Sequence, residues 1–151
     1  SECGTPYQHE FLLQKVGGSY ADQSMKIAVI PSCVGNLCDL QATESSAETL
    51  LTGTCTDVNA GGSAVTPASA GSCFNLHVDA SADDSIFTMD LCTVVSSISG
   101  CSGQSGVYIW TEHGIHEFER DTHYFFDTSG DIEPIAEDRG HAHSENSNAF
   151  Q

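Results

Sequence analysis

Seven cysteines spread over 151 residues constrain the fold of this chain more than any other feature. They lie far apart in the sequence, at Cys3, Cys33, Cys38, Cys55, Cys73, Cys92 and Cys101. None forms the C-x-x-C pair of zinc ribbons or thioredoxin-like sites, and no C-x-x-C-H marks a c-type haem. Separated cysteines in a small acidic chain are typical of disulfides made in an oxidising compartment. We therefore expect a secreted, extracellular protein whose fold is stabilised by disulfides.

Neighbouring cysteines suggest a pairing, because short loops are the easiest to close. On this basis we predict disulfides between Cys33 and Cys38, between Cys55 and Cys73, and between Cys92 and Cys101. Cys3 is then left over, either as a free thiol or as a link between two chains. An odd number of cysteines permits many other pairings, so this connectivity is a hypothesis.

Short apolar segments rich in β-branched and aromatic residues recur along the chain. The clearest are residues 25–30 (MKIAVI), 73–78 (CFNLHV), 86–95 (IFTMDLCTVV) and 107–111 (VYIWT). Small polar residues fill 59–72 and 96–106, which we expect to be long loops. This pattern predicts an all-β, single-domain fold over residues 1–151, either a disulfide-stabilised β-sandwich or a small barrel. Residues 127–151 are expected to form an irregular, acidic, histidine-containing C-terminal segment.

Other segments give mixed patterns. Residues 7–16 (YQHEFLLQKV) fit a strand or a helical stripe, and 43–48 (TESSAE) can start a helical turn. A short strand is expected at 37–43, and a strand with a bulge at Gly53 is expected over 49–58 (TLLTGTCTDV). A further strand is expected at 117–126, where Phe118, Tyr124 and Phe126 would share one face.

The charge of the chain limits its partners. Four basic residues face 21 acidic ones, which gives a formal net charge of -17 at pH 7. Nucleic acid and anionic lipid require a basic surface, so neither is expected as a partner. No apolar run approaches the roughly 18 residues of a membrane span, so membrane insertion is not expected. Cations, basic extracellular proteins, glycans and other copies of the chain remain, and salt or calcium would relieve the self-repulsion.

Histidines and carboxylates concentrate near the C-terminus and predict a transition-metal site. The candidate ligands are His113, His116, His123, His141 and His143. Imidazole nitrogens and carboxylate oxygens are usual donors to zinc or copper. On a strand, His113 and His116 point to opposite faces, so they converge only if Gly114 bends the chain. The alternative is that these histidines are solvated polar groups on an acidic sheet edge. His116 and His123 are the strongest functional candidates.

Acidic turns predict a second kind of cation site. Asp127, Asp131 and Glu133 lie in the run DTSGDIE, and residues 79–84 hold further aspartates. Carboxylate oxygens on turns suit calcium, although the run DTSGDIE lacks the spacing of an EF-hand loop. The alternative is that both segments are ordinary acidic turns.

Signatures of catalysis are missing from the sequence. It has no G-x-S-x-G nucleophile elbow and no phosphate-binding loop, and we assign no catalytic residue. We therefore expect a secreted acidic binding or structural protein that associates with cations and can self-assemble. The alternative is a protein that binds zinc or copper through histidines and carboxylates, or a small metalloenzyme. Tyr108 and Trp110 share one face of a predicted strand and are expected in the core. The alternative is that both are exposed and form, with Tyr124 and Phe125, a platform for sugars or a partner.

Overall fold

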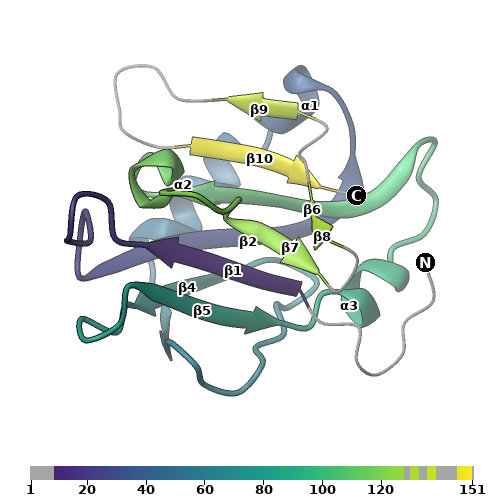
Figure 1. The fold of residues 1–151 in the computed structure, drawn as a ribbon. Coiled ribbons are helices and arrows are strands. Elements are labelled where there is room, and N and C mark those ends of the chain that lie inside the picture. The colour runs from purple at the N-terminus through teal and green to yellow at the C-terminus, as the bar shows by residue number, and fades with distance from the viewer. Residues whose placement is uncertain (1–8, 128–129, 133–135, 139–145, 151) are drawn as a thin grey trace.

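The structure is a computed structural model, which describes residues 9–127, 130–132, 136–138 and 146–150. The described strands form two sheets (Figure 1). The smaller sheet has the order β5 (Asp84–Met89), β1 (His9–Gln14), β7 (Phe125–Asp127) and β8 (Gly130–Asp131). The larger sheet has the order β3 (Thr56–Asn59), β4 (Ser72–His77), β2 (Ser24–Val34), β6 (Gln104–Thr111), β10 (Asn146–Phe150) and β9 (Ala136–Asp138). Neighbouring strands are antiparallel except β3 and β4, which are parallel.

The predicted predominance of strand is confirmed. The strands expected at 25–30, 73–78 and 107–111 correspond to β2, β4 and β6, and the mixed pattern of 7–16 contains β1. Within the described ranges each sheet has an edge strand at both ends, so neither sheet closes into a barrel.

Most apolar side chains lie in a core to which both sheets contribute. Met25, Ile27 and Val29 alternate along β2 and therefore point to the same face of the larger sheet. Phe11 and Leu13 alternate along β1 in the same way and meet them from the smaller sheet. The same buried cluster includes Phe74, Leu76, Phe87, Met89, Val107, Ile109, Ile115, Phe118, Tyr124, Phe125 and Phe150.

Two helices cover the opposite face of the larger sheet, and we call this face with its helices the helical side. Helices α1 (Leu37–Gln41) and α2 (Glu44–Thr52) pack Leu40 and Ala47 in one cluster with Tyr108 and Trp110 of β6. Tyr108 is 2% exposed and Trp110 is 5% exposed, so their predicted place in the core is confirmed. In the described part of the chain, no helix has the length and apolar character needed to cross a membrane.

The strands expected at 37–43 and over the first part of 49–58 are wrong, because residues 37–41 and 49–52 lie in helices, whereas 56–58 do form a strand. Asn36 starts α1 by accepting a hydrogen bond from the Asp39 amide at 3.1 Å, and the Asp39 carboxylate accepts from the Asn36 amide at 3.0 Å. In α2 the hydroxyls of Thr49 and Thr52 donate to carbonyls one turn earlier. Threonine is therefore compatible with the helix, and burial of one helix face outweighs its low helix propensity. Gly53 ends α2 instead of forming a bulge, and β3 follows it.

Two further predicted strands are shorter than expected. β5 ends at Met89 and helix α3 (Cys92–Ser96) follows it, so only part of 86–95 is extended. Between β6 and β7 the chain forms the 3-10 helix η1 (Ile115–Phe118), and β7 starts only at Phe125, which makes the strand at 117–126 wrong over most of its length. Residues three apart share one side of a 3-10 helix, so Ile115 and Phe118 are both buried.

The predicted disulfide between Cys55 and Cys73 is confirmed, with 4.7 Å between their Cα atoms. Cys33 instead bonds to Cys101, which lies 68 residues away in the sequence. The sheet register explains this choice. Cys33 is opposite Ser105 on β6, next to the loop that carries Cys101 into that strand.

The pairs predicted between Cys33 and Cys38 and between Cys92 and Cys101 are therefore wrong. Cys38 is free and exposed, because the capping of α1 holds it in the first turn of a helix and not in a loop that closes onto Cys33. Cys92 is disulfide-bonded. Cys3, the predicted spare cysteine, lies outside the described residues.

Candidate functional site

His116 and His123 meet at a single carboxylate, that of Glu119. His116 is in η1, Glu119 follows that helix directly, and His123 precedes β7. The His116 Nδ1 atom contacts Oε1 of Glu119, and the His123 Nδ1 atom lies 3.2 Å from its Oε2. The backbone amide of Tyr124 also donates to Oε2, at 3.2 Å. We call His116, Glu119 and His123 the histidine–glutamate cluster.

His123 is held by acceptors on both sides of its ring. Its Nε2 atom lies 2.9 Å from the backbone carbonyl oxygen of Ile132, which can only accept a hydrogen bond. Its Nδ1 atom faces the carboxylate of Glu119, which also accepts when ionised. The ring satisfies both contacts when it carries two protons, and its side chain is only 15% exposed. The contacts of the cluster therefore fix the orientation of both imidazole rings.

His113 does not join this cluster. Its Nε2 atom lies 3.0 Å from a carboxylate oxygen of Asp22 and 3.9 Å from one of Glu112. Among the described residues, no three or more His, Cys, Asp or Glu side chains are arranged to hold a metal ion. The structure thus brings together two of the predicted ligands, His116 and His123, through Glu119, which the sequence analysis did not select.

Several predicted ligands fall outside what the structure describes. His141, His143 and Glu133 are not among the described residues. Asp127 and Asp131 lie on β7 and β8, and only their backbone is described. The predicted calcium and transition-metal sites that use these side chains remain predictions.

The acidic turn at residues 79–84 does not gather its carboxylates at one point. Asp79 accepts hydrogen bonds from the amide and hydroxyl of Ser81, at 3.0 and 2.6 Å, and these bonds lower the pKa of its carboxyl group. Asp83 is paired with Lys15 at 3.8 Å. Asp84 is paired with Arg120 at 2.9 Å, so each aspartate has its own partner.

A buried glutamine fixes the segment that carries Glu119. The Gln14 side chain belongs to a residue that is 1% exposed. Its carbonyl oxygen accepts hydrogen bonds from the backbone amides of Arg120, Asp121 and Thr122, at 3.0, 3.2 and 3.2 Å. Its amide nitrogen donates to Asp121 at 2.9 Å and to Asp84 at 3.1 Å. We call these residues, with Lys15 and Asp83, the Gln14 corner.

His77 forms a similar pair at the edge of the larger sheet. Its Nε2 atom lies 2.8 Å from the carboxylate of Asp57 on the neighbouring strand β3, and Asn75 donates to the same oxygen at 3.3 Å. The hydrogen bond with His77 is the main cause that lowers the pKa of Asp57, and the bond from Asn75 adds to it. Both residues of the ion pair are solvent-accessible, so it ties an edge strand to the sheet and adds little stability.

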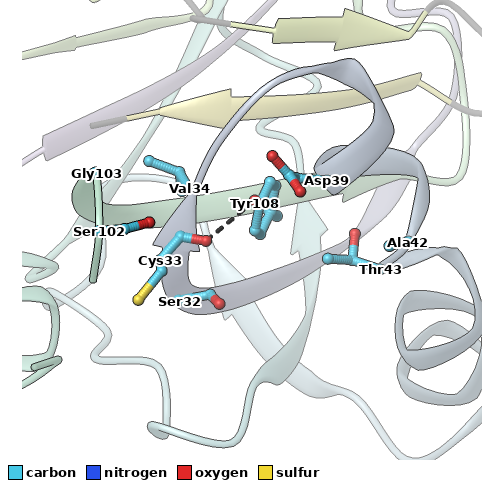
Figure 2. A pocket seen from close by; sticks show the side chains of 9 residues that line it. All are labelled: Ser32, Cys33, Val34, Asp39, Ala42, Thr43, Ser102, Gly103 and Tyr108. Atoms are coloured by element: carbon cyan, nitrogen blue, oxygen red, sulfur yellow. Dashed lines mark hydrogen bonds between the residues drawn. The ribbon is translucent and has the colours of Figure 1, made fainter. Parts of the chain in front are cut away.

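A pocket of about 290 Å³ lies where the end of β2 meets α1 and β6 (Figure 2). It is lined by Ser32, Cys33, Val34, Asp39, Ala42, Thr43, Ser102, Gly103 and Tyr108. The Tyr108 hydroxyl donates to the Cys33 carbonyl and accepts from the Gly35 amide, both at 3.1 Å. Burial raises the pKa of Tyr108, and the nearby carboxylate of Asp39 adds to that rise.

No protein-family model matches the chain, and no curated protein or solved structure shows significant similarity to it.

Proposed function

We propose that this chain is a secreted, disulfide-stabilised β-sandwich domain that binds cations and basic extracellular partners and is not an enzyme. The observation that carries the proposal is the uneven distribution of its charges. Residues 27–119 contain no lysine or arginine. Most of the positive charge that neutralises the acidic side chains of this stretch must therefore come from ions or from partners.

Two of the three basic residues of the described part lie in one place. Lys15 and Arg120 both belong to the Gln14 corner, where they pair with Asp83 and Asp84. Lys26 lies on β2, and it completes the lysines and arginines of the described residues. Two of three basic side chains are thus already neutralised by neighbouring carboxylates.

Three carboxylates of the helical side form no ion pair with any described residue. Asp39 is in α1, and Glu44 and Glu48 are in α2, all three exposed. Like charges repel each other, and a net charge far from zero destabilises the compact state. Counter-ions or a basic partner collected over this surface would offset that cost, which supports the proposed association with cations.

The fold and the cysteines support the secreted sandwich. The two sheets contribute to one core, as the layers of a β-sandwich do. Disulfides such as those of Cys33 and Cys55 persist in oxidising compartments.

Salt dependence of the melting temperature tests the proposal. We expect the Tm of the oxidised chain to rise by a few degrees between about 10 mM and about 300 mM NaCl, because screening weakens the self-repulsion. At matched ionic strength CaCl2 should raise it further. Glu44→Gln combined with Glu48→Gln should reduce the salt response.

A matched control comes from the Gln14 corner. Asp84→Asn removes one negative charge as well, but it takes it from Arg120 and Gln14. It should lower the Tm at low salt, whereas the helical-side substitutions should raise it. A Tm that responds neither to salt nor to the substitutions in α2 would refute the proposal.

Self-assembly, the remaining part of the proposal, is supported by Cys38. Its exposed thiol is the free cysteine of the described residues. A disulfide between two copies would join them through α1. Non-reducing gel electrophoresis of the oxidised protein should show a dimer that is absent in Cys38→Ser. A dimer that persists in this variant would exclude Cys38 as the link.

Binding of zinc or copper is a second candidate function, favoured by the meeting of His116 and His123. As arranged, both Nδ1 atoms face Glu119. A metal ion would have to take the place of the protons between the rings and the carboxylate. Metal analysis of untagged protein should then give stoichiometric metal that is lost in His116→Ala and in His123→Ala. His77→Ala, which alters a histidine–carboxylate pair elsewhere, should retain the metal. Absence of bound metal in the unaltered protein would rule this function out.

A further inference from the structure

The pocket beside α1 is a defined cavity, unlike the acidic surface over which cations are proposed to collect. It is open to solvent, because Cys33, Asp39, Ser102 and Gly103 are all exposed on its walls. Figure 2 shows Tyr108 at its centre, between the Cys33 carbonyl and the side chain of Asp39. It does not include any residue of the histidine–glutamate cluster.

Bonds within the protein hold the walls of the pocket in place before any ligand binds. The disulfide from Cys33 to Cys101 ties the end of β2 to the loop before β6. The Tyr108 hydroxyl bridges the Cys33 carbonyl and the Gly35 amide. The capping of α1 fixes the Asp39 carboxylate by its bond with Asn36. A preformed site loses less entropy when a ligand binds than a mobile one does.

Several polar groups of the lining have capacity left for a ligand. The hydroxyls of Ser32 and Ser102 make no hydrogen bond with any described residue, and each can donate one bond and accept others. The Tyr108 hydroxyl donates once and accepts once, so it retains one acceptor position. Asp39 supplies carboxylate acceptors. The pocket therefore offers both donors and acceptors, which a ligand hydroxyl group matches because it does both.

Charge and size narrow the ligand further. Asp39 is the one carboxylate among the described residues of the lining, and none of them is Lys, Arg or His. An anionic ligand would meet repulsion from Asp39 and from the rest of the acidic surface. The volume of about 290 Å³ lies near the lower end of ligand pockets, which hold drug-sized molecules at roughly 300–1,000 Å³. A single ring fits this space better than a chain of rings.

We propose that this pocket binds one neutral sugar ring, with the hydroxyls of Ser32 and Ser102 and the carboxylate of Asp39 as its hydrogen-bond partners. The site goes beyond the proposed association with cations, because it recognises a neutral molecule. A ligand of about a dozen non-hydrogen atoms in an open polar site is expected to bind with a Kd of about a millimolar.

Nuclear magnetic resonance of the full, oxidised, 15N-labelled chain tests the proposal. Glucose, galactose, mannose and N-acetylglucosamine are titrated separately, with glycerol and ethanolamine as comparison probes. At least one sugar should shift the amide signals of Gly35, Ser102 and Gly103 in a saturable way. Glycerol should not produce the same saturable shifts. Shifts with ethanolamine alone would overturn the sugar assignment in favour of a cationic ligand.

Substitutions in the lining give the second arm of the test. Ser32→Ala combined with Ser102→Ala should weaken sugar binding at least about tenfold, because two hydrogen bonds are lost. Gly103→Leu should abolish it by filling the pocket. A Cβ atom at Gly103 would meet only the Val34 carbonyl oxygen, at 3.7 Å, so the backbone tolerates a side chain there.

Ser46→Ala on the exposed face of α2 is the matched control and should leave binding unchanged. The proposal is overturned if no sugar shifts the three amide signals. It is also overturned if the lining variants, folded as judged by their spectra, bind sugar as the unaltered chain does. None of these results depends on the salt response of the Tm, so this inference and the proposed function can fail separately.

Discussion

The Gln14 corner and the helical side of the molecule are held together by different kinds of bond. At the corner, one buried amide receives hydrogen bonds from three consecutive backbone amides, and Arg120 and Lys15 neutralise neighbouring aspartates. On the helical side, disulfides and the buried rings of Tyr108 and Trp110 connect the elements. The corner contains Lys15 and Arg120, whereas helices α1 and α2 contain no lysine or arginine. The comparison indicates that covalent bonds and aromatic packing, and not ion pairs between described residues of α1 and α2, hold the helices on the sheet.

Removing the disulfide between Cys33 and Cys101 should produce the largest loss in the free energy of unfolding. Cys33→Ser combined with Cys101→Ser removes a crosslink between residues 68 apart, worth about 4 kcal/mol in the chain-entropy account. The same change at Cys55 and Cys73, 18 residues apart, should cost about 3 kcal/mol. Urea unfolding followed by tryptophan fluorescence measures both losses. A larger loss for the shorter loop would show that local packing, and not loop length, determines the stabilisation.

Removing the buried amide tests the other side of the comparison. Gln14→Leu leaves three backbone amides without their acceptor, so the free energy of unfolding should fall by about 3 kcal/mol. Gln23→Leu, at an exposed position, should change it by less than about 0.5 kcal/mol. Similar effects of the two substitutions in urea unfolding would mean that the hydrogen bonds of Gln14 do not stabilise the corner.

Substitutions in the aromatic packing of the helical side should lower the stability by a smaller amount. The Trp110 indole nitrogen donates to the hydroxyl of Thr43 at 2.7 Å, just before α2. Trp110→Phe loses this bond and part of the ring volume, which should cost about 2 kcal/mol. Thr43→Val removes the same bond from the other side. In thermal unfolding the double variant should lose less stability than the sum of the two single variants, and full additivity would contradict a direct coupling.

The smallest expected effect concerns acid. The hydrogen bond from Gln14, helped by those from Thr122 and Arg120, lowers the pKa of Asp121 in the folded chain. The carboxylate therefore contributes stability above its unfolded pKa of about 3.9, and this contribution is lost as the pH falls through the lower folded pKa. Asp121→Asn should be slightly less stable at neutral pH and should lose less on acidification. Urea midpoints between about pH 2 and about pH 6 measure this difference, and parallel curves would contradict it.

The sequence was informative where structure is determined locally. Alternating apolar residues predict β2, β4 and β6, because the side-chain period of a strand is visible within a few residues. The helices α1 and α2 were missed because they form against Tyr108 and Trp110, far away in the sequence. The partner of Cys33 was missed for the same reason, since Cys101 becomes its neighbour only through the register of β2 and β6.

The candidate site shows the same limit. His116 and His123 were selected because histidines stand out by type and spacing. Glu119 was not selected, although it lies between the two histidines in the sequence, because the side chains of an extended strand would lie far apart. In the structure the 3-10 helix turns His116 towards Glu119, which His123 also contacts. No sequence pattern indicated the role of Gln14, because its side chain forms hydrogen bonds with residues 106 to 108 positions away.

The position of β1 has a consequence for how the chain reaches its fold. Gln14 pairs with Asp84, 70 residues later, and Phe11 pairs with Phe125. During synthesis the apolar side of β1 therefore waits without its partners until most of the chain has emerged, and folding dominated by such distant pairings is slow. Unpaired strands invite aggregation in that interval, but mutual repulsion keeps highly charged chains apart. The negative charge that costs the finished fold some stability thus protects the molecule while it is still incomplete.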